Sequence, residues 1–521
     1  MAGPDKLGAL QPRVDAALQA LDNDRAVERI RENDYSLWSD DPTEITEPNR
    51  LGWLQVHRDM QAQVEDLQSF ARGLAAEGYT TAVLMGMGGS SLAPEVLQKS
   101  FGTGEGMLIV NVLDTTHPDS ILELSDRIEP QKTLFIVSSK SGTTVETLSH
   151  FAYFWQIIPD GRHFIAVTDE GSHLHRLGEE RAFRRVFVNR PDIGGRYSAL
   201  SYFGLVPGAL TGVNLPGLLA QADDMSRRCE ATKARENPGA YLGAVMGEAA
   251  LAGRDKLTLF LPQEIDSFGD WVEQLLAEST GKEGKGIVPI VGEPMAPPQA
   301  YGNDRLFVAI GEHPGLQDLE AAGHPVVRLP YEGLNQLGAE FFRWEFATAI
   351  AGQRLHINPF DQPNVQSAKD ATAAILRSGD SDAGATPGLA DVLATISAGD
   401  YIAVLAYLPR SPIMERELQA FRLDLRDRYL VASTLGFGPR YLHSTGQLHK
   451  GGPNSGVFVL LTDDANRDAE IPGQPYTFDR LRRAQALGDL RSLESMGRRV
   501  THIHLEGDRI GAIQALRKGT R

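Results

Sequence analysis

Cysteine is almost absent from this 521-residue sequence, since Cys229 is the only one. A single thiol can close no intrachain disulfide and build no cysteine-based metal cluster. Long apolar runs are also lacking, because no segment reaches the roughly 18 to 20 apolar residues that a membrane-spanning helix needs. Positive charge is scarce too: 51 Lys and Arg face 68 Asp and Glu, which gives a net charge of −17. Such a surface repels nucleic acid and anionic membranes.

The remaining composition is that of an ordinary globular protein, with 42% hydrophobic and 23% charged residues. The length predicts about three to four domains with a substantial core. The N-terminal residues lack the apolar segment of a signal peptide, so we expect a soluble, cytoplasmic protein. Because the net charge is negative, an anionic substrate must meet locally concentrated cations.

The most informative stretch covers residues 133–155. Residues 134–137 form a short apolar run that predicts a strand buried on both faces of a parallel sheet. The turn that follows contains Ser139, Lys140, Ser141 and Thr144, and a helix is expected to begin near residue 144 or 145. Hydroxyls, a lysine and the free N–H groups of a helix start together favour a bound phosphate. The alternative, a simple helix cap, would need only one hydroxyl.

A second turn of this kind comes earlier in the chain. A strand is expected at 81–85, followed by a glycine-rich turn that includes Gly89 and Ser90, and then a helix. Alone, this turn also fits a tight bend or a dinucleotide site, although the third glycine and the acidic residue of a dinucleotide site are missing. Further strands at 108–113 and 164–168 alternate with helices, which indicates a doubly wound α/β sheet. Two such turns at strand carboxyl ends would share one pocket.

Three later segments contain candidate residues that spacing alone leaves ambiguous. Arg196 follows a Gly-Gly pair and fits either a structural ion pair or a guanidinium offered to a developing negative charge. Gln274 and Glu278 are four residues apart on one polar face of a helix expected at 270–279, where a lone glutamate is usually solvated. Lys369 ends a loop rich in proline and amide side chains, which is uninformative by itself.

The order of predicted elements gives a fold class and a domain organisation. We expect an α/β protein with two doubly wound parallel-sheet domains and a smaller C-terminal α/β domain. Residues 1–75 are predicted to be helical and carry no recognisable chemistry, and a flexible linker is expected between 375 and 394. The predicted domains are 76–205, 206–375 with strands at 256–261, 306–310 and 326–329, and 394–521 with strands at 402–408, 457–461 and 501–505.

In this order, the segments resemble the phosphoglucose isomerase family, whose two sugar-isomerase (SIS) type domains interconvert glucose 6-phosphate and fructose 6-phosphate. MGMGGSSLAP is similar to the family's Gly-Ile-Gly-Gly-Ser turn, and VSSKSGTTVET to its Ser-Lys-Thr-x-Thr-Thr turn. The resemblance implies that these two turns hold the substrate phosphate. The residues implied are Gly89, Ser90, Ser139, Lys140, Ser141 and Thr144.

The other three motifs imply roles in catalysis. DIGGRYSALSYFG is similar to the family's Gly-Gly-Arg-Tyr-Ser signature, which implies that Arg196 stabilises an enediolate. QLLAESTGK resembles a segment that contains the family's catalytic base, which implies Glu278 as base and Gln274 as a substrate contact. NPFDQPNVQSAK resembles a further segment of the family's site, which implies that Gln362 and Lys369 also belong to the site. Asn364, in place of a glycine, and Gln366, in place of a glutamate, depart from that segment, as Gly142 departs from an aromatic in the phosphate turn.

The most serious departure concerns the histidine that opens the sugar ring in the family. The expected Gly-Thr-x-Gly-Gln-His stretch is missing after residues 292–294, and Ser-Thr-Gly-Gln-Leu-His at 444–449 is similar to it. We therefore expect the C-terminal domain to supply His449, with His443 as second choice. This glycine-rich region also resembles the isomerase portion of bacterial transaldolase and phosphoglucose isomerase fusions, without a transaldolase portion.

The resemblance implies a cytoplasmic isomerase of glycolysis and gluconeogenesis that acts on a small sugar phosphate and needs no cofactor, metal, nucleic acid or membrane. Two histidine pairs, His173 with His175 and His502 with His504, would suit zinc if extended, but no third ligand lies near them in sequence. Family members are commonly homodimers whose sites are completed across subunits, and the altered C-terminal region would instead suit completion within one chain. The alternatives are a dual phosphoglucose and phosphomannose isomerase, and a non-catalytic phosphosugar sensor.

Overall fold

Three parallel β-sheets organise the chain in the computed structural model, which describes residues 5–41, 50–379 and 384–519, apart from the side chains of residues 365–369. The first sheet has the strand order β2-β1-β3-β4-β5, the second β7-β6-β8-β9 and the third β11-β10-β12-β13. Every pairing within them is parallel. Each sheet therefore reverses its winding direction between its first and third strands, where doubly wound sheets bind ligands.

The first sheet and its helices follow an N-terminal helical segment. That segment contains α1 (Gln11–Asn23), α2 (Ala26–Arg31), α4 (Trp53–Gln61) and α5 (Val64–Ala76). The strands are β1 (Thr81–Met85), β2 (Ile109–Leu113), β3 (Thr133–Ser138), β4 (Phe164–Asp169) and β5 (Arg185–Asn189). The helices are α6 (Leu92–Phe101), α7 (Pro118–Arg127), α8 (Val145–Ile157), α9 (His173–Glu180) and α10 (Tyr202–Thr211).

The second sheet is built from short strands with long helices around them. Its strands are β6 (Lys256–Phe260), β7 (Val288–Ile290), β8 (Arg305–Ile310) and β9 (Val326–Leu329). Its helices are α11 (Leu215–Arg228), α12 (Pro238–Leu251), α13 (Phe268–Thr280), α14 (Leu316–Ala321) and α15 (Leu337–Leu355).

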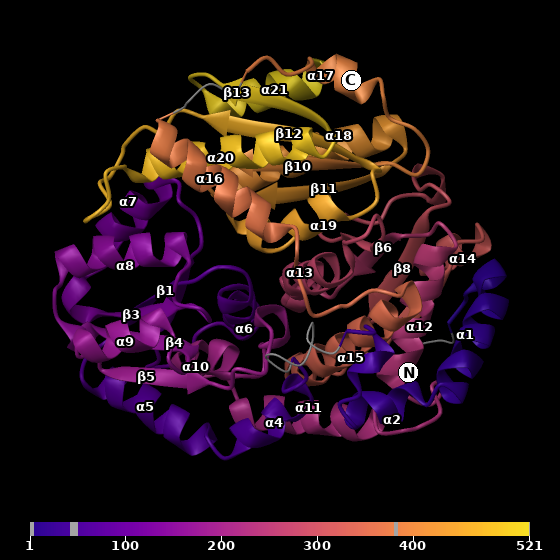
Figure 1. Cartoon of the computed structure of the whole chain (residues 1–521), viewed down its shortest axis with the longest axis horizontal. Helices are drawn as coiled ribbons and strands as arrows, with labels where there is room; N and C mark the ends of the chain where they lie inside the picture. Colours follow the sequence, from indigo (N-terminus) through magenta and orange to yellow (C-terminus); the bar gives the residue numbers. More distant parts are fainter. Residues whose placement is uncertain (1–4, 42–49, 380–383, 520–521) are drawn as a thin grey trace.

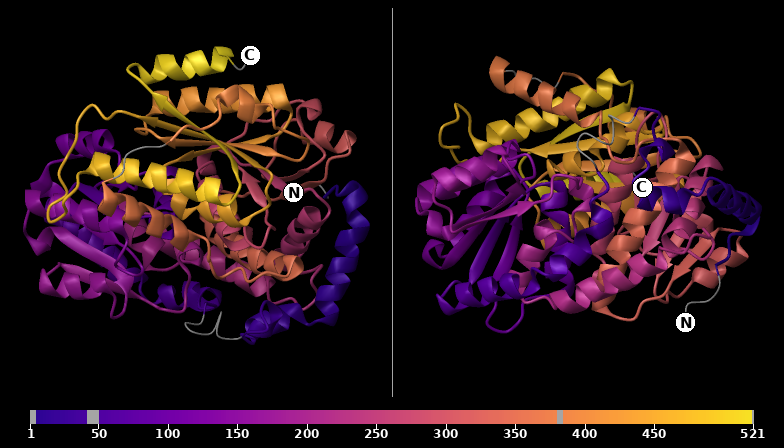
Figure 2. Two further views of the ribbon diagram at one scale, coloured as in Figure 1. Left: turned by 45° about the horizontal axis from the view of Figure 1, so that its top comes forward. Right: turned by 60° about the horizontal axis from the view of Figure 1, so that its bottom comes forward.

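The third sheet follows α16 (Val365–Ser378) and α17 (Leu389–Leu393). Its strands are β10 (Tyr401–Tyr407), β11 (Ala432–Phe437), β12 (Gly456–Asp463) and β13 (Arg499–Leu505). Its helices are α18 (Pro412–Tyr429), α19 (Gly446–Gly451), α20 (Phe478–Ser495) and α21 (Arg509–Gly519). In Figure 1 the first sheet lies on the left, the second on the right and the third at the top, and Figure 2 shows the third sheet from two further directions.

Both faces of the first sheet are buried, which explains its continuous apolar strands. Successive side chains of β1 point to opposite faces. Ala82 and Leu84 join the core that also contains Leu97 of α6, whereas Val83 joins a separate core with Phe154 of α8. The run at 134–137 is buried for the same reason.

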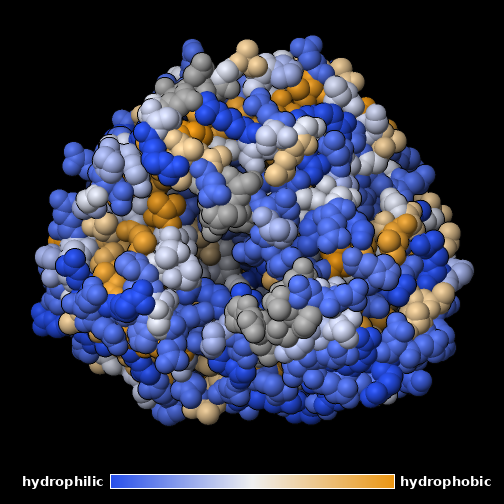
Figure 3. All heavy atoms as spheres, in the orientation of Figure 1, coloured by the Kyte–Doolittle hydropathy of each residue, from blue (hydrophilic) through white to orange (hydrophobic). Residues whose placement is uncertain are grey.

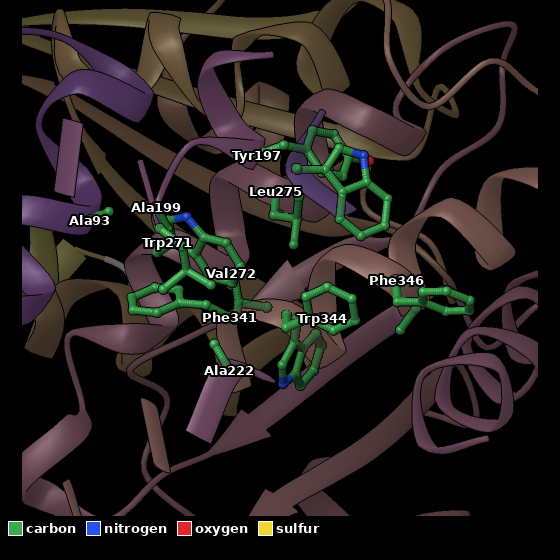
Figure 4. Close-up of a cluster of buried hydrophobic side chains, with 14 of the residues drawn as sticks. Ala93, Tyr197, Ala199, Ala222, Trp271, Val272, Leu275, Phe341, Trp344 and Phe346 are labelled. Carbon is green, nitrogen blue, oxygen red and sulfur yellow. The ribbon is translucent and has the colours of Figure 1, made fainter. Parts of the chain in front are cut away.

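One aromatic core joins the first and second sheets. Trp271 of α13 packs edge-on against Phe341 of α15 with ring centroids 4.8 Å apart, and both are fully buried (Figure 4). Tyr197, which follows the first sheet, belongs to the same core. Since interiors are close-packed, α13 is held firmly between the two sheets.

Buried ion pairs hold the third sheet in place, together with apolar contacts: Phe478 joins the core of the first sheet, and Ala277 and Ile290 join the core of the third. His117 of the loop before α7 lies 3.2 Å from Asp463 at the end of β12, and neither side chain is exposed. Arg482 of α20 donates to the same carboxylate at 2.6 Å. The carboxyl end of the third sheet, where an independent α/β domain would bind a ligand, is therefore filled by groups that hold the chain together.

The predicted fold class is confirmed, and the errors are local. All ten predicted strands are present within two residues of their predicted bounds. Three strands were not predicted, namely β5, β7 and β11. The predicted linker was too long, because residues 376–378 continue α16 and Leu389–Leu393 form α17; residues 380–383 lie outside the described part. None of the described helices combines the length and apolar character needed to cross a membrane.

Candidate active site

A cavity of about 460 Å³ contains most of the predicted site residues. It lies where the turns after β1 and β3 face α13, and the surface between α6 and α13 is visibly hollowed near the centre of Figure 3. Ten of the predicted residues line it: Gly89, Ser90, Ser139, Lys140, Ser141, Thr144, Arg196, Gln274, Glu278 and Gln362. The other lining residues are Arg50, Met87, Gly88, Asp169, Pro191, Gly195 and His443.

The two hydroxyl-rich turns meet because β1 and β3 are neighbours on either side of the point where the first sheet reverses direction. Ser138 Oγ donates to the carbonyl of Ser90 at 3.3 Å, so one turn is hydrogen-bonded to the other. The expectation that both turns share one pocket therefore agrees with this geometry.

The turn after β3 presents an uncapped helix start to the cavity. Thr144 is the N-cap of α8 but its side chain makes no capping hydrogen bond. Its hydroxyl instead lies 3.0 Å from the hydroxyl of Ser139, which accepts from the N–H of Gly142 at 3.1 Å. Free N–H groups at a helix N-terminus and clustered hydroxyls form a site suited to a phosphate.

Gly142 explains one departure of the sequence from the family pattern. Its φ of +70° is a conformation that side-chain-bearing residues rarely adopt, and a Cβ there would lie 2.3 Å from the backbone nitrogen of Leu174. The tight packing of α9 against this turn leaves no room for the aromatic residue that the family has at this position.

The ammonium group of Lys140 is already bonded within the protein. Its Nζ forms an ion pair with Asp169 at the end of β4 and donates to the carbonyl of Pro191 at 3.0 Å. Burial lowers the pKa of Lys140, and Asp169 acts in the opposite direction. Much of the positive charge of this lysine is therefore already neutralised.

Glu278 projects from α13 into the opposite side of the cavity. It is 6% exposed, and Gln274 donates to its carboxylate at 3.1 Å. Burial raises the pKa of Glu278, while Arg196, His443 and Lys282 act in the opposite direction. A carboxylate whose pKa is raised above its ordinary value is a stronger base than one in water.

Arg196 forms a long ion pair with this carboxylate. Its Nη1 is 3.8 Å from Glu278, beyond hydrogen-bonding distance. The guanidinium donates instead to neutral oxygens, at 2.7 Å to Ser279, Gln362 and the carbonyl of Pro359. These contacts fix the plane of the guanidinium without a hydrogen bond to a carboxylate, so it can stabilise a negative charge that develops nearby.

The structure brings His443 to the cavity and leaves His449 outside it. His443 ends η10 (Arg440–His443), the short turn after β11, and its carbonyl accepts from Gln274 at 2.9 Å. His449 lies on α19, is 3% exposed and packs between the rings of Tyr441 and Phe458. Burial lowers the pKa of His449 well below its ordinary value, which fits a neutral core residue. This geometry thus does not support His449, the residue first expected from the sequence to open the sugar ring.

A carboxylate orients the imidazole of His443. Its Nε2 lies 3.0 Å from Oε1 of Glu146, which also accepts from Gln485 at 2.8 Å. Burial opposes ionisation of Glu146, but His443 holds the pKa of that carboxyl below its ordinary value. Because an ionised carboxylate only accepts hydrogen bonds, Nε2 bears the hydrogen and Nδ1 is the nitrogen left for a ligand.

The loop at 358–362 is fixed by a buried lysine. Lys282 donates to the carbonyls of Asn358 and Asp361, each at 2.7 Å, and forms an ion pair with the Asp361 side chain. Burial lowers the pKa of Lys282 to about 8, against the influence of Asp361. Lys369 belongs to the backbone of α16, but its side chain lies outside the described part.

Sequence reasoning missed three side chains of the cavity or ranked them low. Arg50 comes from the N-terminal segment to which no chemistry was assigned, Asp169 directly follows the strand predicted at 164–168, and His443 was the second choice. No periodicity singles out Arg50 or Asp169, because both reach the cavity through tertiary contacts. Where the structure is described, no set of three or more His, Cys, Asp or Glu side chains is arranged to hold a metal. His173 and His175 start a helix, and His502 and His504 both contact Thr462.

A second cavity, of about 500 Å³, lies on the other side of α13. Asp270, Glu273 and Arg440 are among its lining residues, and none of the predicted site residues whose side chains are described lines it. The chemistry that the sequence predicts is therefore concentrated in the cavity beside Glu278, although it is the smaller of the two.

Comparison with known proteins gives one consistent family. A family model described as phosphoglucose isomerase matches residues 21–288. A glucose-6-phosphate isomerase of Carboxydothermus hydrogenoformans is 28% identical over 405 residues, which cover 64% of this chain and 86% of that protein. A probable glucose-6-phosphate isomerase of Methanococcus maripaludis is 26% identical over 61% of this chain and 82% of its own length.

Two crystal structures share the fold. A glucose-6-phosphate isomerase of Chlamydia trachomatis has a TM-score of 0.59 and 21% identity, and covers 70% of this chain and 86% of its own. A protein of Thermus thermophilus described as hypothetical has a TM-score of 0.61 and 24% identity, and covers 72% of this chain and 100% of its own. At these identities the likeness is evidence of the fold alone.

The close contact between the turn after β1 and the loop before Arg196 can be tested with two glycines. A Cβ on Gly89 would lie 2.0 Å from the carbonyl oxygen of Gly195, whereas a Cβ on Gly195 would meet nothing within 4 Å. We expect Gly89→Ala to lower the free energy of unfolding by about 1–3 kcal/mol through overpacking. Gly195→Ala is the matched control and is expected to cause no such loss. Equal denaturant midpoints for the two variants would show that the turns are not packed in this way.

Proposed function

The chain belongs to the phosphoglucose isomerase family, and we propose that the cavity beside Glu278 interconverts glucose 6-phosphate and fructose 6-phosphate through a cis-enediol. The observation that supports this most is that Ser90, Ser139 and Glu278 line one cavity. A phosphate held by the two turns thus lies in the same cavity as the carboxylate that faces them. The reaction belongs to glycolysis and gluconeogenesis.

The two turns hold the phosphate of the open-chain sugar. The hydroxyls of Ser139 and Thr144 and the uncapped start of α8 donate to its oxygens, and Ser90 contributes from the opposite turn. Binding through a group that takes no part in the reaction positions the carbon atoms that do react.

Glu278 moves the proton between neighbouring carbons. Its carboxylate removes the proton from C2 of the aldose, and the electron pair of the C–H bond forms the enediolate. The proton of the C2 hydroxyl passes to O1, and the carboxylate returns its proton to C1 to give the ketose. The negative charge that appears on the sugar oxygens is stabilised by Arg196, whose hydrogen bonds go to neutral acceptors. Gln274, which donates to Glu278, fixes the orientation of the carboxylate.

His443 opens the sugar ring by moving a proton between the ring oxygen and O1. Its Nδ1 is the free nitrogen, because Nε2 is bonded to Glu146. This role replaces the one first expected for His449, which is packed between aromatic rings. The role of Lys369 in ring opening and that of Gln362 as a substrate contact rest on the resemblance of their segment to the family's.

The third sheet supplies His443 to the cavity of its own chain. The family arrangement, in which subunits complete each other's sites, is therefore not needed for this histidine. A homodimer is compatible with this arrangement, and each subunit would then carry a complete set of the lining residues.

Glu278 and Arg196, which face the two turns across the cavity, argue against a non-catalytic sensor. A sensor needs a phosphate site, but it does not need a buried carboxylate with a raised pKa next to a guanidinium whose hydrogen bonds go to neutral oxygens. Glu278 and Arg196 fit proton abstraction.

Replacement of the base tests the proposal directly. Glu278→Gln keeps the shape of the side chain and removes the proton acceptor, so kcat should fall by roughly 10²–10⁴-fold. Loss of the C2 hydrogen of glucose 6-phosphate to solvent D₂O, followed by NMR, should fall in parallel. In the unchanged protein, turnover should decline as the pH is lowered through the raised pKa of Glu278, since only the ionised carboxylate accepts a proton.

Glu273→Gln is the matched control for this variant. Glu273 lies on the same helix but faces the second cavity, so its replacement should leave proton exchange unchanged. A folded Glu278→Gln protein with normal exchange would rule out Glu278 as the base.

Completion of the site within one chain can be tested by mixing two inactive variants. His443→Asn is expected to lower kcat by roughly 10²-fold through loss of proton transfer. When Glu278→Gln and His443→Asn chains are co-expressed, no activity should return, because both residues act in the same cavity of each chain. If subunits exchanged the histidine, heterodimers would contain one intact site, and about a quarter of the wild-type activity would return. Recovery of that size would contradict the proposed arrangement.

A further inference from the structure

Arg50 is a charged side chain of the active-site cavity to which neither the family motifs nor the mechanism above gives a role. Among the described residues before β1, it is the one that lines the cavity. It is half-buried and lies in the segment that leads into α4. Its presence there requires an explanation, because a guanidinium in a cavity loses hydration.

The segment around Arg50 is anchored to the loop that carries Arg196. Leu51 forms an antiparallel bridge with Ile193, and the N–H of Gly52 donates to the carbonyl of Asp192 at 3.0 Å. Trp53 is fully buried, and its ring centroid lies 5.6 Å from that of Tyr197. Arg50 is thus held in place by contacts on both sides of Arg196 in the sequence.

Arg50 differs from the other two cations of the cavity in what surrounds its charge. Lys140 is ion-paired with Asp169, and Arg196 donates to neutral oxygens and lies 3.8 Å from Glu278. The hydrogen bond of Arg50 within the described residues is a long one, 3.5 Å from Nη1 to the carbonyl of Pro191, and it forms no ion pair with them. Burial, and then the charge of Arg196, lower the pKa of Arg50, whereas the charge of Asp169 acts in the opposite direction.

The position of Arg50 indicates which part of a substrate it would meet. The carbonyl of Pro191 accepts from both Arg50 and Lys140, which places Arg50 beside the lysine of the phosphate turn. Glu278 is instead next to Arg196, at the end of the cavity where the carbons react. Arg50 is therefore close to the phosphate end.

We propose that Arg50 is a phosphate-binding residue of this site, whose guanidinium, without an ion pair among the described residues, helps to neutralise the substrate dianion that the ion-paired Lys140 neutralises only in part. The inference rests on the proposed function and names a specificity residue for it. A planar guanidinium can donate two parallel hydrogen bonds to phosphate oxygens, which a lysine cannot. Substrate recognition at this end then combines hydroxyls, a helix N-terminus and one arginine from outside the first sheet.

The experiment compares Arg50→Gln, Arg50→Lys and the control Arg181→Gln. Arg181 is an exposed arginine over the ring of Trp155, outside the cavity, and its replacement changes the net charge equally. Arg50→Gln should raise the KM for fructose 6-phosphate and weaken the binding of inorganic phosphate, measured by calorimetry, by roughly 10- to 100-fold, with little change in kcat. Arg50→Lys should give intermediate values, because it keeps the charge and loses the paired donors. Arg181→Gln should match the unchanged protein.

Two results would overturn the inference. Unchanged phosphate affinity in Arg50→Gln, with its melting temperature retained, would show that Arg50 does not bind the phosphate. A fall in kcat with unchanged phosphate affinity would place Arg50 at the reacting carbons instead. Calorimetry with inorganic phosphate needs no turnover, so these results are separate from failure of the proposed function, which would appear as absence of isomerisation by the unchanged protein.

Discussion

The arrangement of the active site depends on one buried guanidinium, that of Arg440. It donates to Asp114 at 2.8 Å, forms an ion pair with Glu95 and lies 3.3 Å from Asp270. These carboxylates belong to the first and second sheets, whereas Arg440 follows a strand of the third. Charges withdrawn from water are stable only with partners in good geometry, so the cluster fixes how the three sheets meet. It thereby fixes η10 and brings His443 to a cavity formed by the other two sheets.

Most of the fold could be predicted from sequence because central strands of a parallel sheet are buried on both faces. The run at 134–137 and those of β1 and β10 are apolar without interruption. The three strands that were not predicted, β5, β7 and β11, are all edge strands. β5 is partly exposed, β7 is three residues long and contains a proline, and β11 contains polar residues and a glycine, so the apolar pattern of each is weak. The weak signal in these three strands is thus local, since the edge strands β2, β9 and β13 were predicted.

The site residues also differ in how well the sequence predicted them. Residues that follow strands, such as Ser90 and Ser139, were found from local pattern, and the family resemblance added Glu278, which spacing alone left as a surface residue. Arg50 and His443 were missed or ranked low, because each reaches the cavity through contacts between segments far apart in the chain. The similarity of a short segment, residues 444–449, to the family favoured His449, but the orientation of α19 places that ring in the core.

The central claim is that one chain holds a phosphate in two serine-bearing turns while a single carboxylate reaches adjacent carbons of the attached sugar. A crystal structure with bound fructose 6-phosphate tests it most directly. The account predicts phosphate oxygens within hydrogen-bonding distance of Ser139 and Thr144, and C1 and C2 each within about 3.5 Å of the Glu278 carboxylate. A sugar phosphate bound instead in the cavity on the other side of α13, or with its carbons out of reach of Glu278, would contradict it.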